Sequence, residues 1–240
     1  MSEKKSRIIT EFAKAGWKLT DLQVDQFVRY YELLVEWNEK MNLTAITDFD
    51  EVVIKHFIDS VTGSLVCDFS VVDNVLDLGT GAGFPGIPLK ILYPDTEFVL
   101  MDSLNKRITF LQEVIDQLGL KKITAVHGRA EEMGRNVSYR EKCDVCTSRA
   151  IANTSTLLEY CMPFVKVHGC FVAYKSGKFQ EEIVGAKKTL HLLQTELESE
   201  KNFMLADTDM ERTLVVFRKK GKTAMKYPRK AGMPSKQPLG

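Results

Sequence analysis

Residues 77–86, which read DLGTGAGFPG, form the clearest chemical motif of the chain. They follow the apolar residues Val75 and Leu76 and lead into the sequence GIPLKIL. Alternating glycines let a backbone turn sharply and approach a bound molecule without clashes from Cβ atoms. The free N–H groups at the start of a helix attract polar or anionic groups. The motif therefore predicts a ligand-binding loop between a buried strand and a helix, rather than an ordinary turn.

Two classes of cofactor fit this loop. Gly81, Gly83 and Gly86 have the spacing of the dinucleotide fingerprint. Asp77 followed by Gly79, Gly81 and Gly83 has the spacing of the loop that binds S-adenosylmethionine (SAM). A dinucleotide carries a pyrophosphate, which an acid would repel, whereas SAM carries an ammonium and a sulfonium, which an acid would attract. The Asp77 carboxylate therefore favours SAM, with a nicotinamide dinucleotide as the alternative.

Further candidates lie at the ends of the apolar runs that follow. Asp102 ends the next run, 23 residues after Gly79, which is near the spacing expected for a carboxylate on ribose hydroxyls. It could also cap the following helix. Ala130 and Glu131 follow the third run, where they would lie beside an adenine. Arg149 follows the fourth run, and either contacts a ligand on the methyl-donor side or forms a structural ion pair.

The elements that would position these residues alternate between strands and helices from residue 72 onward. We expect strands near 74–78, 97–102, 122–127, 142–147, 170–175, 197–205 and 212–219, and helices near 85–92, 105–118, 155–166 and 178–194. This alternation predicts an α/β fold of the Rossmann-like methyltransferase type, with a seven-stranded, mostly parallel sheet and an antiparallel hairpin at its end. Ligands of such sheets bind at the carboxyl ends of the strands.

Residues 1–70 read as a helical N-terminal extension. Thr20 and Gln23 form a capping box that opens a long helix, and Asp48 with Glu51 opens another. In that second helix His56 and Asp59 share a face away from the apolar side chains, as in a surface pair. We therefore expect three segments, namely this extension (1–70), a SAM-dependent methyltransferase domain (71–219) and a basic C-terminal tail (220–240).

The charge of the chain is unevenly distributed. The formal net charge of the 240 residues is +1, but the chain from Arg218 onward holds eight Lys or Arg and no acid, which leaves −7 on residues 1–217. A basic arm on an acidic body is typical of a protein that binds a polyanion such as RNA, and a solvated tail is the alternative.

Cysteine use and hydropathy favour a cytoplasmic protein. Five scattered cysteines, without a signal peptide, fit a reducing compartment. Cys143 and Cys146 lie three apart on an expected strand and so face opposite ways, which favours packed thiols over a metal site. We expect no bound metal. No apolar run reaches membrane-spanning length, so we also expect no membrane association.

Taken together, these motifs resemble the RsmG (GidB) family of bacterial methyltransferases, which act on guanine N7 in 16S ribosomal RNA. The resemblance runs nearly end to end. It covers Trp37-Asn38 with Asn42-Leu43-Thr44, the His56-x-x-Asp59-Ser60 helix, the loop 77–86 with its Phe84-Pro85-Gly86 ending, Asp102-Ser103 with Lys106-Arg107, Arg129-Ala130-Glu131, Ser148-Arg149-Ala150, and 227–232 in the tail. The ending of the loop is narrower than the general SAM motif.

The resemblance implies SAM as the cofactor and the small ribosomal subunit, through its 16S RNA, as the partner. It implies SAM contacts at Gly79, Phe84, Ala130, Glu131 and Arg149. Asp77, Gly81 and Asp102 are further expected contacts, because of their charge or their place in the glycine loop. Hypotheses for the RNA side are Asn42, His56, Asp59, Arg229 and Lys230. We expect the protein to act as a monomer.

The implied reaction is an in-line displacement at the methyl group. Guanine N7 carries a lone pair and has no proton to lose, so a general base is unnecessary and we expect no catalytic residue beyond those that position the reactants. The alternatives are a SAM-dependent enzyme for a small molecule or another RNA, a NAD-dependent oxidoreductase, and an RNA-binding module without catalysis.

Overall fold

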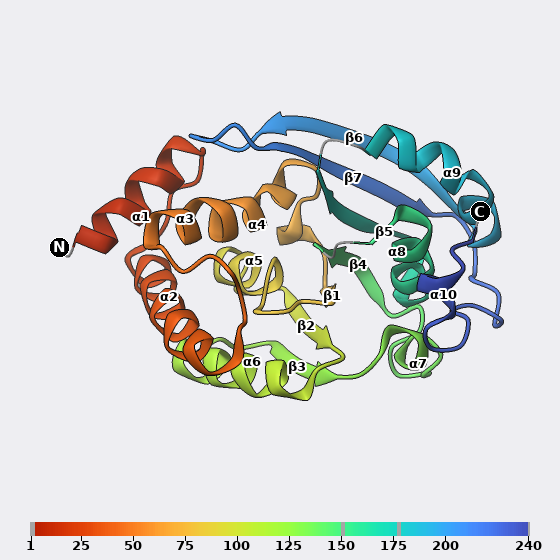
Figure 1. Cartoon of the computed structure of the whole chain (residues 1–240), viewed down its shortest axis with the longest axis horizontal. Helices are drawn as coiled ribbons and strands as arrows, with labels where there is room; N and C mark the ends of the chain where they lie inside the picture. Colours follow the sequence, from red (N-terminus) through yellow and green to blue (C-terminus); the bar gives the residue numbers. More distant parts are fainter. Residues whose placement is uncertain (1–2, 150–151, 177–178, 240) are drawn as a thin grey trace.

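The protein folds around one seven-stranded sheet. The computed structural model describes residues 3–149, 152–176 and 179–239, so Ala150 of the Ser-Arg-Ala motif lies outside the described residues. The strands are β1 (Asn74–Leu78), β2 (Glu97–Asp102), β3 (Ile123–His127), β4 (Cys143–Ser148), β5 (Val165–Lys175), β6 (Thr195–Met204) and β7 (Glu211–Lys219). Their order in the sheet is β3-β2-β1-β4-β5-β7-β6 (Figure 1).

The predicted fold class is confirmed. Strands β1 to β5 pair in parallel, and β7 lies antiparallel between β5 and β6. One boundary differs from expectation, because α8 (Thr154–Cys161) ends well before residue 166. Pro163 cannot continue a helix, so a short 3₁₀ turn (Met162–Phe164) follows and β5 begins already at Val165.

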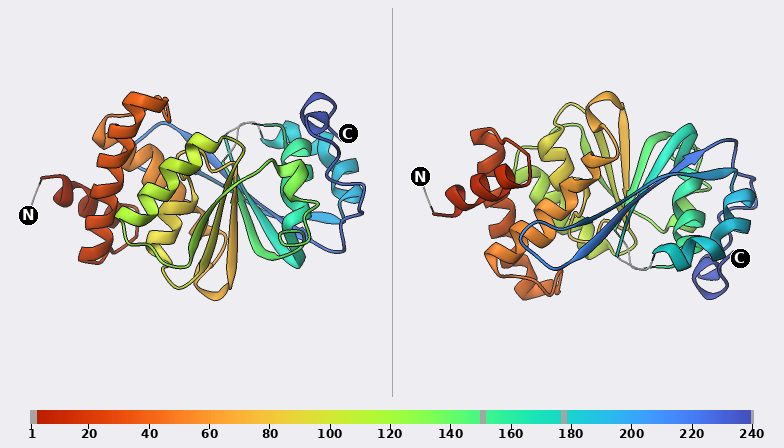
Figure 2. Two further views of the ribbon diagram at one scale, coloured as in Figure 1. Left: turned by 90° about the horizontal axis from the view of Figure 1, so that it is seen from below. Right: turned by 90° about the horizontal axis from the view of Figure 1, so that it is seen from above.

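Helices cover both faces of the sheet. Alternate residues of β1 point to opposite faces, so that Val75 and Leu76 belong to two separate hydrophobic cores. The first core contains α5 (Gly86–Leu92) and α6 (Asn105–Gln117), and the second contains α8 and α9 (Phe179–Leu192). Figure 2 shows these two groups of helices on opposite sides of the sheet.

The N-terminal helices add a further layer over the first core. They are α1 (Glu3–Lys14), α2 (Asp21–Met41), α3 (Phe49–Val52), the π-helical turn Val53–Ile58, α4 (Asp59–Val61) and the 3₁₀ turns Thr62–Leu65 and Phe69–Val71. The capping box of α2 is formed as predicted, with reciprocal bonds of 3.3 and 2.9 Å between Thr20 and Gln23. Because these helices share one core with the sheet, the extension is packed onto the α/β domain, and the boundary at residue 70 stays a prediction.

The stretch around the end of the π-helical turn is buried on all sides. Asp59 and Ser60 follow the π-helical turn, and their exposed fractions are 3% and 0%. All residues from 57 to 63 are buried, so this stretch has no solvent-facing side. Turns of this kind occur often at functional sites. The surface-pair interpretation of His56 and Asp59 is therefore wrong for Asp59, which is buried.

The C-terminal segment is also anchored. It contains a short helix, α10 (Met233–Lys236), and crosses α7 (Ala130–Met133) and α8 (Figure 1). No helix among the residues described is both long and apolar enough to cross a membrane.

Candidate cofactor crevice and acceptor pocket

The glycine loop after β1 has the geometry that its sequence predicts. Gly79, Gly81 and Gly83 all have positive φ, at 71°, 63° and 98°, a region that favours glycine. The N–H groups of Gly79 and Thr80 donate to the Met101 carbonyl of β2, at 2.8 and 3.3 Å. The loop therefore bridges the ends of the two central strands.

Asp77 organises this loop from beneath. Its side chain is fully buried, and its Oδ2 accepts bonds from the Thr80 hydroxyl at 2.6 Å and the Gly86 N–H at 2.8 Å. The Thr147 hydroxyl donates to Oδ1 at 3.4 Å. Burial raises the pKa of Asp77 to about 6, although the bonds from Thr80 and Gly86 oppose the shift. Direct contact of Asp77 with a cationic cofactor stays a prediction, and its geometry favours a positioning role.

A crevice of about 330 Å³ opens above the carboxyl ends of β1 to β4. It brings together four residues that the sequence predicted as cofactor contacts, namely Gly79, Asp102, Ala130 and Glu131. Ser148, Leu157, Tyr160 and Cys161 line its other side. The crevice therefore lies where ligands of open α/β sheets bind.

Asp102 joins three parts of the crevice wall. It accepts bonds from the Gly81 N–H at 3.0 Å and the Leu104 N–H at 2.9 Å, and it pairs with Arg107 at 3.1 Å. The N-cap residue of α6 is Leu104, so Asp102 is not the helix cap that we considered. Its carboxylate is 3% exposed at the crevice, and its role as a ribose ligand stays a prediction.

A second, larger pocket of about 610 Å³ lies beside the crevice, over β4, β5 and β7. Its lining includes His56, Asp59, Arg149, Lys175 and Arg212. The buried Asp59 carboxylate pairs with Arg149 at 3.1 Å through one oxygen and with Arg212 at 2.8 Å through the other. Asp59 thus ties the N-terminal helices to the ends of β4 and β7. We call this hollow the acceptor pocket.

Arg149 lines the acceptor pocket, whereas the buried Phe84 lines neither hollow and packs against His56 and Arg149. The His56 ring stacks on Phe84 with centroids 4.6 Å apart, and the Arg149 guanidinium lies 5.0 Å from the Phe84 ring centroid. Arg149 also donates to the Lys55 carbonyl at 3.2 Å. Its neighbour Ser148 lines the crevice. The end of β4 therefore separates the two hollows, with one residue facing each.

Burial and the positive charge of Arg149 lower the pKa of His56 to about 4, so the ring is neutral at pH 7. The unfolded chain binds a proton at this residue up to about pH 6.5. Stabilisation by the neutral ring is therefore lost as the pH falls toward 4. We expect the difference in unfolding free energy between the wild type and His56→Gln to grow by roughly 2 kcal/mol from pH 4 to pH 6.5. Urea denaturation at a series of pH values measures it, and a difference independent of pH would contradict it.

The other RNA-side candidates are spread over the structure. Asn42 is the exposed, left-handed cap residue after α2 and does not line the acceptor pocket. Arg229 is engaged with Glu159, whereas Lys230 is exposed. The structure therefore brings His56 and Asp59 together and places Asn42, Arg229 and Lys230 elsewhere.

Sequence reasoning missed three residues of the acceptor pocket region. The Thr44 hydroxyl lies 2.9 Å from Nε2 of His56, and its place in the Asn42-Leu43-Thr44 motif was a signal for it. Lys175 and Arg212 reach the pocket through the pairing of β5 with β7, in which Lys175 lies opposite Thr213. No local pattern marks them.

All five cysteines are free thiols, and four of them are buried. Within the described ranges, no three His, Cys, Asp or Glu side chains are grouped as metal ligands would be.

The fold is shared with methyltransferases of known structure. It is similar to TYW2 of M. jannaschii, solved in complex with AdoMet, with a TM-score of 0.51 and 15% identity over 67% of this chain and 73% of that one. It is also similar to a putative methyltransferase solved with the Haloferax volcanii Trm112 activator, with a TM-score of 0.57 and 13% identity over 78% and 98% of the two chains. The order of the strands and the crevice at their switch point therefore define a Rossmann-like fold, the same one that these methyltransferases have.

Sequence comparison assigns the family. The model of GidB, described as rRNA small subunit methyltransferase G, matches residues 23–214. A protein named ribosomal RNA small subunit methyltransferase G from Lachnoclostridium phytofermentans is 52% identical over 98% of this chain and 97% of its own length. One with the same name from an Exiguobacterium species is 50% identical over 98% of both. The chain belongs to the rRNA small subunit methyltransferase G family.

Proposed function

We propose that this protein transfers a methyl group from SAM to N7 of a guanine in 16S ribosomal RNA. The observation that carries the proposal is the meeting of two hollows at the end of β4, where Ser148 lines the crevice and Arg149 the acceptor pocket. A donor in the first hollow and a base in the second would approach each other across this strand end.

The crevice fits SAM better than a dinucleotide. Asp102 and Glu131 place two buried carboxylates in its wall, which favours a cationic ligand with ribose hydroxyls over a pyrophosphate. In this proposal Asp102 holds the ribose and Ala130 with Glu131 lies at the adenine. Gly79 and Gly81 allow close approach, and Asp77, Phe84 and Arg149 fix the loop. SAM supplies an electrophilic methyl group on its sulfonium.

The residues of the acceptor pocket act by positioning. Guanine N7 attacks with its own lone pair, so no side chain has to remove a proton. His56 is neutral at pH 7, and the Asp59 carboxylate is engaged by two arginines, so neither is poised as a base. Holding the base and the donor in line supplies the rate enhancement.

The test is methyl transfer from labelled SAM to ribosomal particles. We expect label in small-subunit RNA and none in large-subunit RNA. If no label is transferred to small-molecule acceptors in the same assay, the alternative of a small-molecule methyltransferase is excluded. Calorimetry with SAM and with NAD shows which of the two binds, and binding of NAD in place of SAM would favour the oxidoreductase alternative. Binding of SAM without transfer to any RNA would favour an RNA-binding module without catalysis.

The exposed lysines of the C-terminal segment are the proposed phosphate contacts. Replacing Lys222, Lys226 and Lys230 by alanine should weaken RNA binding. The plot of log binding constant against log salt concentration should become less steep, by about 0.7 to 0.9 for each lost contact. Filter binding at several salt concentrations measures this slope.

Alanine at the exposed Lys18, Lys121 and Lys187 is the matched control, since it removes the same charge away from the segment. Equal slopes for the two triple variants would remove the segment from the RNA interface.

The proposed setting is the cytoplasm of a bacterium, where ribosomes are made, with the protein acting as a monomer.

A further inference from the structure

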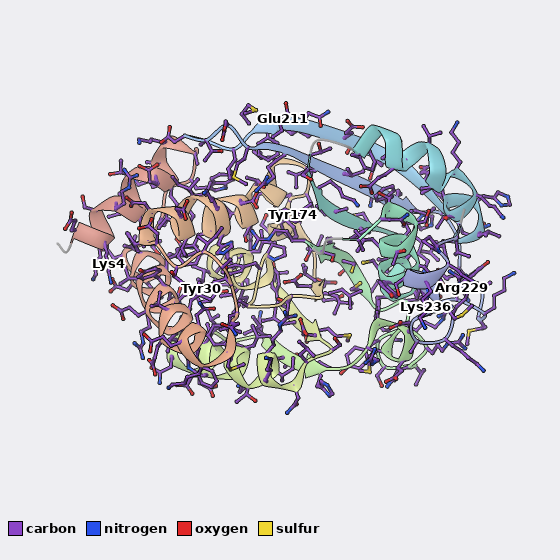
Figure 3. The ribbon with its side chains drawn as sticks, viewed as in Figure 1. Lys4, Tyr30, Tyr174, Glu211, Arg229 and Lys236 are labelled. Atoms are coloured by element: carbon purple, nitrogen blue, oxygen red, sulfur yellow. The ribbon has the colours of Figure 1, made fainter. Side chains whose placement is uncertain are left out.

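The C-terminal segment is fastened to the body by a buried ion pair. Glu159 of α8 is fully buried, and both its oxygens accept bonds from Arg229, with the shortest at 2.7 Å from Nη2. The backbone N–H of Arg229 donates to the same carboxylate at 2.8 Å. Figure 3 shows Arg229 beside α10 and Lys236. A bidentate arginine on a buried acid fixes both position and orientation.

Two more arginines bind the stretch of backbone that precedes Arg229. Arg140 donates to carbonyls of Thr223, Ala224 and Tyr227, and Arg135 donates to those of Lys226 and Pro228. The segment is therefore held along its backbone as well as by its side chains.

The same segment reaches the wall of the crevice. The N–H of Gly232 donates to Oε1 of Glu131 at 2.9 Å. The Tyr160 hydroxyl interacts with both Ser235 and Glu131. Since Glu131 and Tyr160 line the crevice, their positions depend on where residues 229–235 lie.

We propose that residues 226–236, the C-terminal clip, are a positioning element of the cofactor site that sets SAM affinity by holding Glu131 and Tyr160. This inference rests on the proposed function, because it takes the crevice as the SAM site. It gives the segment a second role beside phosphate binding by its lysines. Gly232 and Arg229 are its positioning residues.

Gly232→Ala tests the clip with little steric change. Gly232 has φ +79°, which an alanine disfavours, yet an added Cβ would meet no atom within 4 Å. The strained backbone should move its N–H away from Glu131. We expect the Kd for SAM, measured by calorimetry without RNA, to rise about fivefold. In turnover assays KM for SAM should rise while kcat stays unchanged.

Gly16→Ala is the matched control. Gly16 follows α1, has φ +95°, and likewise has no atom within 4 Å of an added Cβ. It should lose similar thermal stability without any change in the Kd for SAM. A second pair is Arg229→Lys against Arg218→Lys, because Arg218 forms a bidentate pair with Glu198 on the hairpin.

The inference would be overturned if the wild type binds SAM and both clip variants have the same Kd for SAM as their controls. Weaker binding in the clip variants alone would support it. A wild type that does not bind SAM would instead contradict the proposed function, so the two failures can be told apart.

Discussion

Replacing Asp59 by alanine should cost the protein about 3 kcal/mol of unfolding free energy. The Asp59 carboxylate is 3% exposed and lies between Arg149 and Arg212, whose side chains are only 20% and 17% exposed. Removing it leaves two partly buried guanidinium groups without their common counter-charge. Urea denaturation monitored by circular dichroism measures the loss.

Glu51→Ala provides the comparison for Asp59→Ala. Glu51 pairs with Lys55 in the same stretch of helix, but the two side chains are 48% and 28% exposed. Screening by water limits such a pair to less than about 1 kcal/mol. Equal losses in the two variants would mean that Asp59 does not join the N-terminal helices to the strand ends.

Replacing Arg149 by lysine should lower methyl transfer about 100-fold, with a Kd for SAM about tenfold weaker. Lysine keeps the charge but loses the planar fork that bonds Asp59 and Lys55 while lying against the Phe84 ring. The Phe84 end of the glycine loop would then shift relative to β4. Steady-state kinetics on small subunits, with calorimetry for SAM, measures both effects.

Arg212→Lys separates this effect from loss of the Asp59 ion pair. Arg212 bonds the other oxygen of Asp59, comes from β7, and does not line the cofactor crevice. It should leave the Kd for SAM unchanged. If both variants weakened SAM binding equally, the effect would come from the ion pair and not from the contact with Phe84.

The features that the sequence could predict are local ones. The glycines of the loop predict its positive φ angles, because few other residues adopt them. Two residue types at the right spacing, Thr20 and Gln23, predict the capping box of α2. Apolar runs at regular intervals predict the parallel strands. These signals depend on neighbouring residues alone, so the fold class and the place of the crevice follow from them.

The features that the sequence could not predict depend on distant partners. Asp77 carries a charge that suggests a ligand contact, but Thr80, Gly86 and Thr147 surround it and bury it. Asp59 lies outside the apolar face of its helix in the sequence, but it is buried against Arg149 and Arg212, which are 90 and 153 residues away. The basic C-terminal segment reads as a free arm because Glu159, 70 residues earlier, gives no sign of being its anchor.

The most direct test of the proposed reaction is to map the methyl group on the RNA. Unmodified small subunits are incubated with the protein and methyl-labelled SAM, and the RNA is then cleaved chemically at N7-methylguanine. We predict one new cleavage position in 16S RNA, carrying the label and absent without SAM. Label that enters the RNA at another atom, or SAM binding with no transfer to these particles, would contradict the account.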